Sequence, residues 1–174
     1  WIGSDARDLL HRARQRLLDD GTGKALEEPS RIRQIDVPGD DAVITNLRNA
    51  NIATVVASGN SVRSNAISFP ACISAAVSVG STNKQNQVST SFSNSANFLS
   101  LLAPGGSITS AYPGNAYIGA SGTSMAAPHV AGAWAILKAA KPAATVTEIL
   151  TALQNTGVPI TDPRNNIVKP LIQI

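Results

Sequence analysis

A short run of apolar, largely β-branched residues lies about a third of the way along the chain. Positions 52–57 read Ile-Ala-Thr-Val-Val-Ala and lead directly into Ser58-Gly59-Asn60. A run of this length that ends in turn-forming residues is typical of a strand buried on both faces of a parallel sheet. The residues before it, from Asp40 to Asn51, have apolar side chains at helical spacing, and asparagine readily takes the left-handed conformation that ends a helix. We therefore predict a helix, a tight turn and a buried strand.

Three later segments also predict strands. Each is short, lacks helical spacing, and is bounded by residues that favour turns. The bounding residues are Pro70, a Ser/Asn-rich stretch at 81–97, Pro104-Gly105-Gly106 and Pro113-Gly114. The predicted strands are 75–81, 98–103 and 107–112.

The pattern changes at Ser124, where a nearly continuous series of small and apolar residues begins. It extends to Pro142 and predicts a buried helix that packs closely against its neighbours. Thr145 and Glu148 have the spacing of a capping box, in which each residue's side chain bonds the other's backbone N–H. They predict a last helix at 149–156, which we expect Gly157 to end.

The first 39 residues differ from the rest in charge. Residues 1–41 contain seven basic and nine acidic side chains, whereas no Asp or Glu occurs from position 42 to 147. Positions 5–20 predict a charge-rich amphipathic helix, and 21–39, with several Gly and Pro residues, predict a loop. We therefore expect two parts, a charged segment at 1–39 and a folded portion at 40–174.

Composition excludes several classes of partner. No apolar run approaches the ~20 residues that cross a bilayer, and no basic-then-apolar leader is present. The net charge of +3 is small, and no Lys/Arg cluster is interleaved with aromatic residues. Cys72 is the one cysteine, so no disulfide can form within the chain. We expect neither a nucleic-acid partner nor a membrane partner.

The most informative segment reads Gly122-Thr123-Ser124-Met125-Ala126-Ala127-Pro128-His129-Val130-Ala131-Gly132. It places a serine at the start of an apolar helix, where unpaired N–H groups and partial positive charge favour an alkoxide and a neighbouring oxyanion. A serine before a helix is more often only a cap. The α/β-hydrolase elbow G-x-S-x-G does not fit, because Ala126 stands where its second glycine is required.

This full segment resembles the serine motif of the subtilisin-like serine proteases, or subtilases. The resemblance implies that Ser124 is the catalytic nucleophile. The strand ending in Ser58-Gly59-Asn60 is similar to the one that delivers the family's oxyanion-hole asparagine, which implies that role for Asn60. A Gly-Asn pair alone is also a common turn. The implied substrate-binding residues are Ala57, Ser58, Gly59, Ser68 and Thr123.

Subtilase chemistry also requires a histidine as base and an aspartate to orient it. On an ideal helix His129 lies about 140° around from Ser124 and ~7.5 Å along the axis, so its ring points away from the nucleophile. His11 lies in a charged helix without the family's histidine motif. The aspartate look-alike at 17–23 has the wrong residue order. We therefore identify no triad histidine or aspartate in this chain.

The resemblance implies an α/β fold, namely the C-terminal half of a subtilisin-like three-layer domain with a mostly parallel sheet, incomplete at its N-terminal side. It implies a serine endopeptidase that acts on polypeptides and is secreted. We expect no cofactor, and no metal site either, because hard cations prefer carboxylate ligands and positions 42–147 contain none. The missing N-terminal half of the domain is then a candidate partner. The alternative is a truncated or diverged remnant that binds peptides without cleaving them. On either hypothesis we expect the isolated chain to be inactive.

Overall fold

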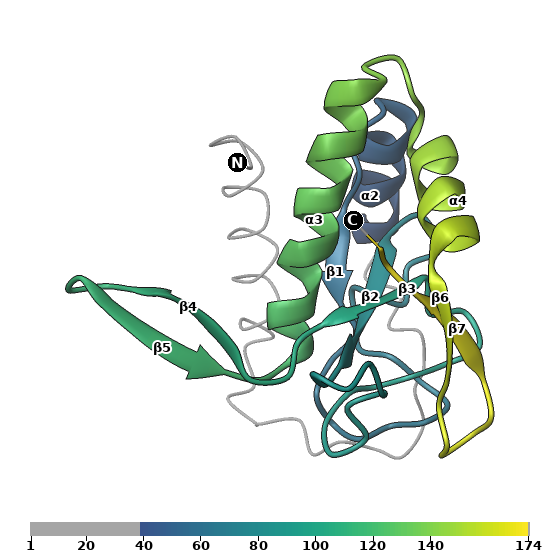
Figure 1. Ribbon diagram of the computed structural model, residues 1–174. Helices are drawn as coiled ribbons and strands as arrows, with labels where there is room; N and C mark the ends of the chain where they lie inside the picture. Colours follow the sequence, from purple (N-terminus) through teal and green to yellow (C-terminus); the bar gives the residue numbers. More distant parts are fainter. Residues whose placement is uncertain (1–38, 174) are drawn as a thin grey trace, which may run out of the picture. The chain divides into compact units, whose positions relative to one another are not determined.

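The computed structural model describes residues 39–173. In this range it contains both helices and strands, with five consecutive strands between the first helix and the next two, as Figure 1 shows. In chain order they are α2 (Asp40–Asn49), β1 (Val55–Ala57), β2 (Val77–Thr82), β3 (Leu101–Pro104), β4 (Ile108–Tyr112), β5 (Ala116–Ala120), α3 (Thr123–Ala140), α4 (Val146–Thr156), β6 (Val158–Thr161) and β7 (Val168–Leu171).

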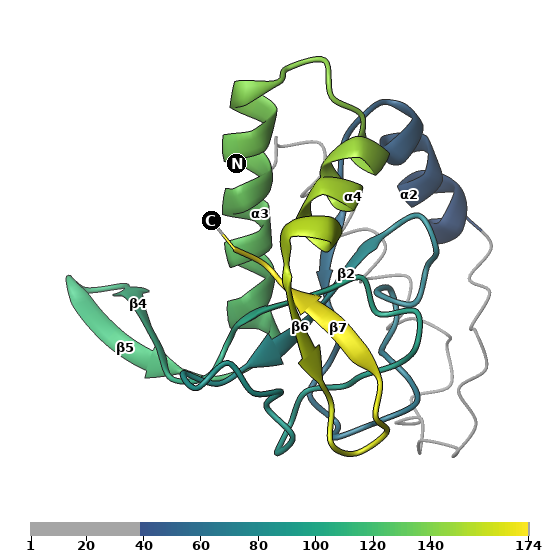
Figure 2. The same ribbon diagram turned by 45° about the vertical axis from the view of Figure 1, so that its right-hand side comes forward.

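Five of the strands form one sheet in the order β1-β2-β3-β7-β6. The pairs β1–β2, β2–β3 and β3–β7 are parallel, and only β6 runs antiparallel to its neighbour β7. The strands β4 and β5 pair with each other in a separate two-stranded ribbon, which projects away from the sheet in both views (Figures 1 and 2). The α/β fold with a mostly parallel sheet is therefore confirmed.

Adjacent residues of β1 point to opposite faces of the sheet, as the two-residue period of a strand requires. Val55 packs into the cluster formed with α3 and α4, whereas Val56 packs with Ile44 of α2 on the other side. Helices thus cover both faces, which explains why the strand sequence is apolar throughout rather than alternating.

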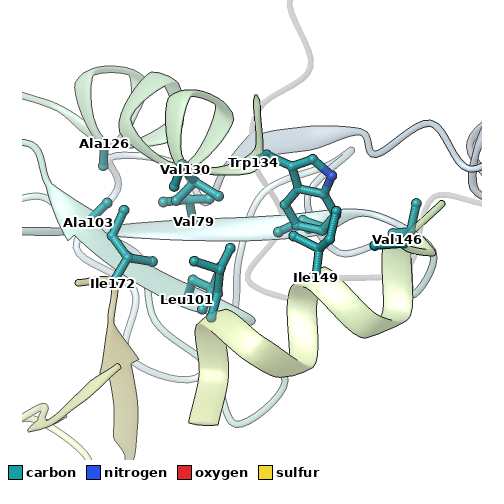
Figure 3. Packing of buried hydrophobic residues seen from close by; sticks show 13 residues of the cluster. Val79, Leu101, Ala103, Ala126, Val130, Trp134, Val146, Ile149 and Ile172 are labelled. Carbon is teal, nitrogen blue, oxygen red and sulfur yellow. The ribbon is translucent and has the colours of Figure 1, made fainter. Parts of the chain in front are cut away.

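The larger core lies between the sheet and the two helices α3 and α4 (Figure 3). Val79 and Leu101 are fully buried and face Val130 and Trp134 of α3, with Ile149 of α4 beside them. Burying a side chain of this size stabilises the fold by about 1.5–3 kcal/mol. This cluster fixes α3 across β1, β2 and β3.

The outer face of α3 departs from the prediction of a buried helix. Ala126, Val130 and Ala133 are buried, but Ala135 and Ile136 are exposed, and Ile136 has 58% of its surface accessible. Because this helix is apolar on all sides, the sequence does not reveal which side faces the sheet.

The ends of the helices test three local predictions. Asn51 has φ 60°, the left-handed conformation expected after α2. The capping box between Thr145 and Glu148 is present at α4. Gly157 ends α4, as predicted, but in an extended conformation with φ −70°. Its lack of a side chain is needed instead for close packing, since a Cβ there would lie 2.7 Å from the Pro170 Cβ.

The predicted strands all appear, with ends that agree or differ by up to three residues, whereas β5, β6 and β7 were not predicted. The helix expected at 5–20 and nearly all of the loop expected at 21–39 lie outside the described residues. Among residues 39–173, no helix is both long and apolar enough to cross a membrane.

Candidate active site

The carboxyl end of β1 and the amino end of α3 meet through a set of three hydrogen bonds. Asn60 Oδ1 accepts from the Thr123 backbone N–H at 2.9 Å and from Thr123 Oγ1 at 3.0 Å. Thr123 Oγ1 in turn accepts from the Gly59 N–H at 3.2 Å. Thr123 is fully buried whereas Asn60 is exposed, so the buried threonine anchors the exposed asparagine. With the amide oxygen held by two donors, the Nδ2 group of Asn60 is the end left to bind a ligand.

The first turn of α3 presents a second free donor beside the exposed side chain of Ser124. The Thr123 N–H is bound to Asn60, and the Met125 N–H bonds Gly122 O at 3.0 Å. The Ser124 N–H forms no hydrogen bond to any residue in the described part of the chain. The N-cap residue of this helix, Gly122, has no side chain to cap it, in contrast to α4 with its complete capping box. An oxyanion placed here would meet an open, partially positive helix end.

Ser58, Gly59 and Ser68 form a closely packed wall next to this turn. The Ser68 N–H donates to Ser58 O at 2.9 Å. Gly59 has φ +100°, and a Cβ at this position would lie 2.2 Å from Ser68 Oγ. Only glycine fits this backbone and this space. Ala57 precedes the wall as the last residue of β1.

Comparison with known proteins agrees with the resemblance seen in the serine motif. A family model described as the Subtilase family matches residues 20–168. Subtilisin BL from Lederbergia lenta is 40% identical over 117 residues, which are 67% of this chain and 43% of that protein. The chain belongs to the subtilase family.

Other subtilases give the same result. The extracellular serine proteinase of Thermus sp. (strain Rt41A) is 40% identical over 131 residues, 74% of this chain and 30% of the relative. The solved structure of a cold adapted subtilisin-like serine proteinase matches with a TM-score of 0.69 and 32% identity, covering 75% of this chain and 48% of that one. This chain thus spans less than half the length of these subtilases.

The family match begins at residue 20, inside the segment 1–39 in which the sequence showed no resemblance. The division of the chain at residue 39 stays a prediction. The structure brings Ser58, Gly59, Asn60, Ser68, Thr123 and Ser124 together at one end of the sheet through the contacts above.

His129 cannot act as the base for Ser124 in this arrangement. Its Nδ1 lies 2.8 Å from the carbonyl oxygen of Met125, to which it donates, so the ring is tied to its own helix. His11 lies outside the described residues. Between residues 39 and 173 no group of three or more His, Cys, Asp or Glu side chains is placed to hold a metal.

Two residues that support this candidate site were not found from the sequence. Asn94, in the loop between β2 and β3, is fully buried and bonds the Ser58–Arg63 segment. Arg164, between β6 and β7, donates from Nη1 to Ser93 O at 2.9 Å. Neither belongs to a recognisable motif, since a buried Asn in a Ser/Asn-rich loop resembles any other turn residue.

Asp162 holds Arg164 in place through a buried ion pair. The Asp162 Oδ2 to Arg164 Nη2 distance is 2.6 Å, and Asp162 is 2% exposed. Burial acts to raise the pKa of Asp162, but hydrogen bonds and charge from Arg164 outweigh it and hold the pKa below its usual 3.8. The carboxylate therefore stays ionised at neutral pH.

Proposed function

We propose that this chain is the nucleophile-bearing portion of a serine endopeptidase that hydrolyses polypeptides by acyl transfer. The observation that supports it most directly is the Thr123–Asn60 clamp, which leaves two donors, Asn60 Nδ2 and the Ser124 N–H, beside an exposed serine hydroxyl. A nucleophile flanked by two such donors has the arrangement that stabilises a tetrahedral oxyanion.

In the proposed reaction Ser124 Oγ attacks the carbonyl carbon of the scissile bond, and its proton passes to a base. The carbonyl oxygen becomes an oxyanion that accepts hydrogen bonds from the Ser124 N–H and Asn60 Nδ2. The C–N bond then breaks, the amine leaves with a proton from the conjugate acid of that base, and an acyl-enzyme remains. Water, deprotonated by the same base, hydrolyses the ester and restores Ser124. The wall of Ala57, Ser58, Gly59 and Ser68 accepts the side chain preceding the scissile bond.

The base and its orienting aspartate belong, in this proposal, to another part of a subtilase domain. Two surfaces support such a partner. The strand β1 ends the described sheet and so offers an unpaired edge, and the outer face of α3 exposes apolar side chains such as Ile136. We infer that the remainder of a subtilase domain pairs with β1 and covers α3. Secretion, which the name of the Thermus relative states for that protein, is our expectation for this one as well.

The isolated chain is expected to be inert, and a fluorophosphonate probe tests this. Without a base to accept its proton, the serine hydroxyl is a weak nucleophile and only the oxyanion hole assists the reaction, so the probe should not label the chain rapidly. The matched control is Ser124→Ala. Rapid labelling of the wild-type chain that this substitution abolishes would refute the inert state and reveal a base within the chain.

Complementation tests the catalytic proposal itself. The chain is co-expressed with the part of a full-length subtilase that precedes the matched region, and peptide hydrolysis is measured. We expect activity that Ser124→Ala abolishes and that Asn60→Ala lowers about 10²- to 10³-fold in kcat. Asn97→Ala, at an exposed asparagine whose side chain forms no hydrogen bond within the described chain, is the control and should leave kcat unchanged.

A non-catalytic role is the second candidate, because His129, the one histidine at positions 39–173, is bonded to Met125 O and leaves Ser124 without a base among the described residues. A remnant of this kind would bind extended peptides at the same wall and release them intact. Formation of a stable complex in the complementation experiment, with peptide binding but no cleavage, would establish this alternative and overturn the catalytic proposal.

A further inference from the structure

We propose that Asn94 is the positioning residue of the oxyanion loop, which we define as residues 58–63. This inference rests on the proposed role of Asn60. Asn60 is exposed, and within residues 39–173 its side chain is held through Oδ1 alone, by Thr123. The placement of its Nδ2 group therefore depends on the backbone around it, and that backbone is bonded to Asn94.

The side chain of Asn94 uses its full hydrogen-bonding capacity on this loop and on Ser68. Its Oδ1 accepts from the Ser61 and Arg63 N–H groups, both at 3.0 Å. Its Nδ2 donates to Ser58 O at 3.1 Å and to Ser68 Oγ at 3.2 Å. Backbone N–H groups can only donate and carbonyl oxygens can only accept, so these partners fix the orientation of the amide.

Backbone groups of Asn94 add two further bonds on the near side of Asn60. The Asn94 N–H donates to Gly59 O, and Ser58 Oγ donates to Asn94 O, each at 2.9 Å. The Asn94 amide also lies against Gly59, where a Cβ would come within 2.5 Å of Nδ2. The residues on both sides of Asn60 are thus attached to one buried side chain.

The loop that carries Asn94 is itself anchored from the C-terminal strands. Arg164 Nη1 donates to Ser93 O, the residue before Asn94, and Asp162 holds the guanidinium through Nε at 2.9 Å and Nη2 at 2.6 Å. Asn94 therefore connects a rigid ion pair to the loop. Rigid support matters because a misplacement of about 1 Å in a catalytic group can cost about 10²-fold in rate.

Asn94→Asp in the full chain tests the proposal by ¹H–¹⁵N NMR. Aspartate has nearly the same shape and can still accept from Ser61 and Arg63, but it brings an oxygen against Ser58 O. We expect the Asn60 side-chain amide signals to move and the Ser61 and Arg63 amides to exchange with solvent about five- to tenfold faster. Thr145→Ala, which removes hydrogen bonds at the start of α4, is the control and should leave these signals in place.

If Asn94→Asp folds and leaves both the Asn60 signals and the exchange rates of the Ser61 and Arg63 amides unchanged, the inference is overturned. Asn94 would then be a buried polar residue with satisfied hydrogen bonds and no positioning role. If that variant does not fold, Ser68→Ala serves in its place. It removes one acceptor of Asn94 Nδ2 and should move the same signals by a smaller amount, and no movement would again overturn the inference. The NMR signals are measured without catalysis, so the two proposals can be judged separately. If Asn94→Asp moves the Asn60 signals but the wild-type complex does not cleave peptides, the proposed function is rejected and the positioning role of Asn94 is kept.

Discussion

Replacing Gly59 with alanine separates two reasons why glycine is required at the end of β1. Its φ of +100° is unfavourable for any residue with a Cβ, and its space is closed by Ser68 Oγ at 2.2 Å and Asn94 Nδ2 at 2.5 Å. The backbone term costs about 1–2 kcal/mol. Forcing a methyl group into a packed site adds about 1–3 kcal/mol. We therefore expect Gly59→Ala to lower the free energy of unfolding by about 2–5 kcal/mol.

Gly114 provides the matched control for the backbone term. It also has positive φ, +83°, but a Cβ there would meet nothing within 4 Å. Gly114→Ala should therefore cost only about 1–2 kcal/mol. Urea denaturation of both variants, with comparison of midpoints at constant m-value, measures the difference.

Relief of the crowding gives a second check. In the double variant Gly59→Ala with Ser68→Gly, the contact at 2.2 Å disappears but the contact with Asn94 remains, so recovery should be partial. If Gly59→Ala costs no more than Gly114→Ala, the wall is not closed by Ser68 and Asn94, and our account of the pocket is refuted.

Three further predictions concern the ion pair, the last helix and the exposed face of α3. Asp162→Asn should destabilise the chain by about 3–5 kcal/mol at pH 7, because it leaves Arg164 without its buried partner. As the pKa of Asp162 is lowered on folding below its usual 3.8, its stabilising contribution is present above that pH and is lost as pH falls, so a urea series against pH should show less acid sensitivity in Asp162→Asn. Thr145→Ala should lower unfolding free energy by about 0.5–2 kcal/mol through loss of the cap, whereas Thr151→Ala, on the exposed side of α4, should stay within about 0.5 kcal/mol in the same assay; equal effects would contradict the capping assignment. Ile136→Glu should reduce self-association of the isolated chain in size-exclusion chromatography and weaken complementation, and no change in either would argue against a partner on this face.

Local patterns were sufficient to predict the elements that depend on neighbours in sequence. The apolar run before Gly59 gave β1, and the spacing of Thr145 and Glu148 gave the start of α4. The short C-terminal strands β6 and β7 were missed because each contains a proline and only four residues. Their pairing is decided by the sheet that they join rather than by their own propensity.

The residues of the candidate site likewise fall into two groups, those predicted from a local motif and those that only the structure reveals. Ser124 and Asn60 were predicted from motifs, since the family resemblance lies in contiguous residues. The bond from Arg164 to Ser93 joins positions 71 residues apart, and that from Asn94 to Ser58 joins positions 36 apart. Neither pair has a spacing rule, because loops meet only after the sheet has formed.

The clamp between Asn60 and α3 involves Thr123 and not the side chain of its neighbour Ser124. Removal of the Ser124 hydroxyl therefore deletes the proposed nucleophile but leaves both proposed oxyanion donors where they are. Under the proposed mechanism, Ser124→Ala in the complemented complex is accordingly suited as a substrate trap, and sequencing the intact peptides that it retains would report the cleavage preference.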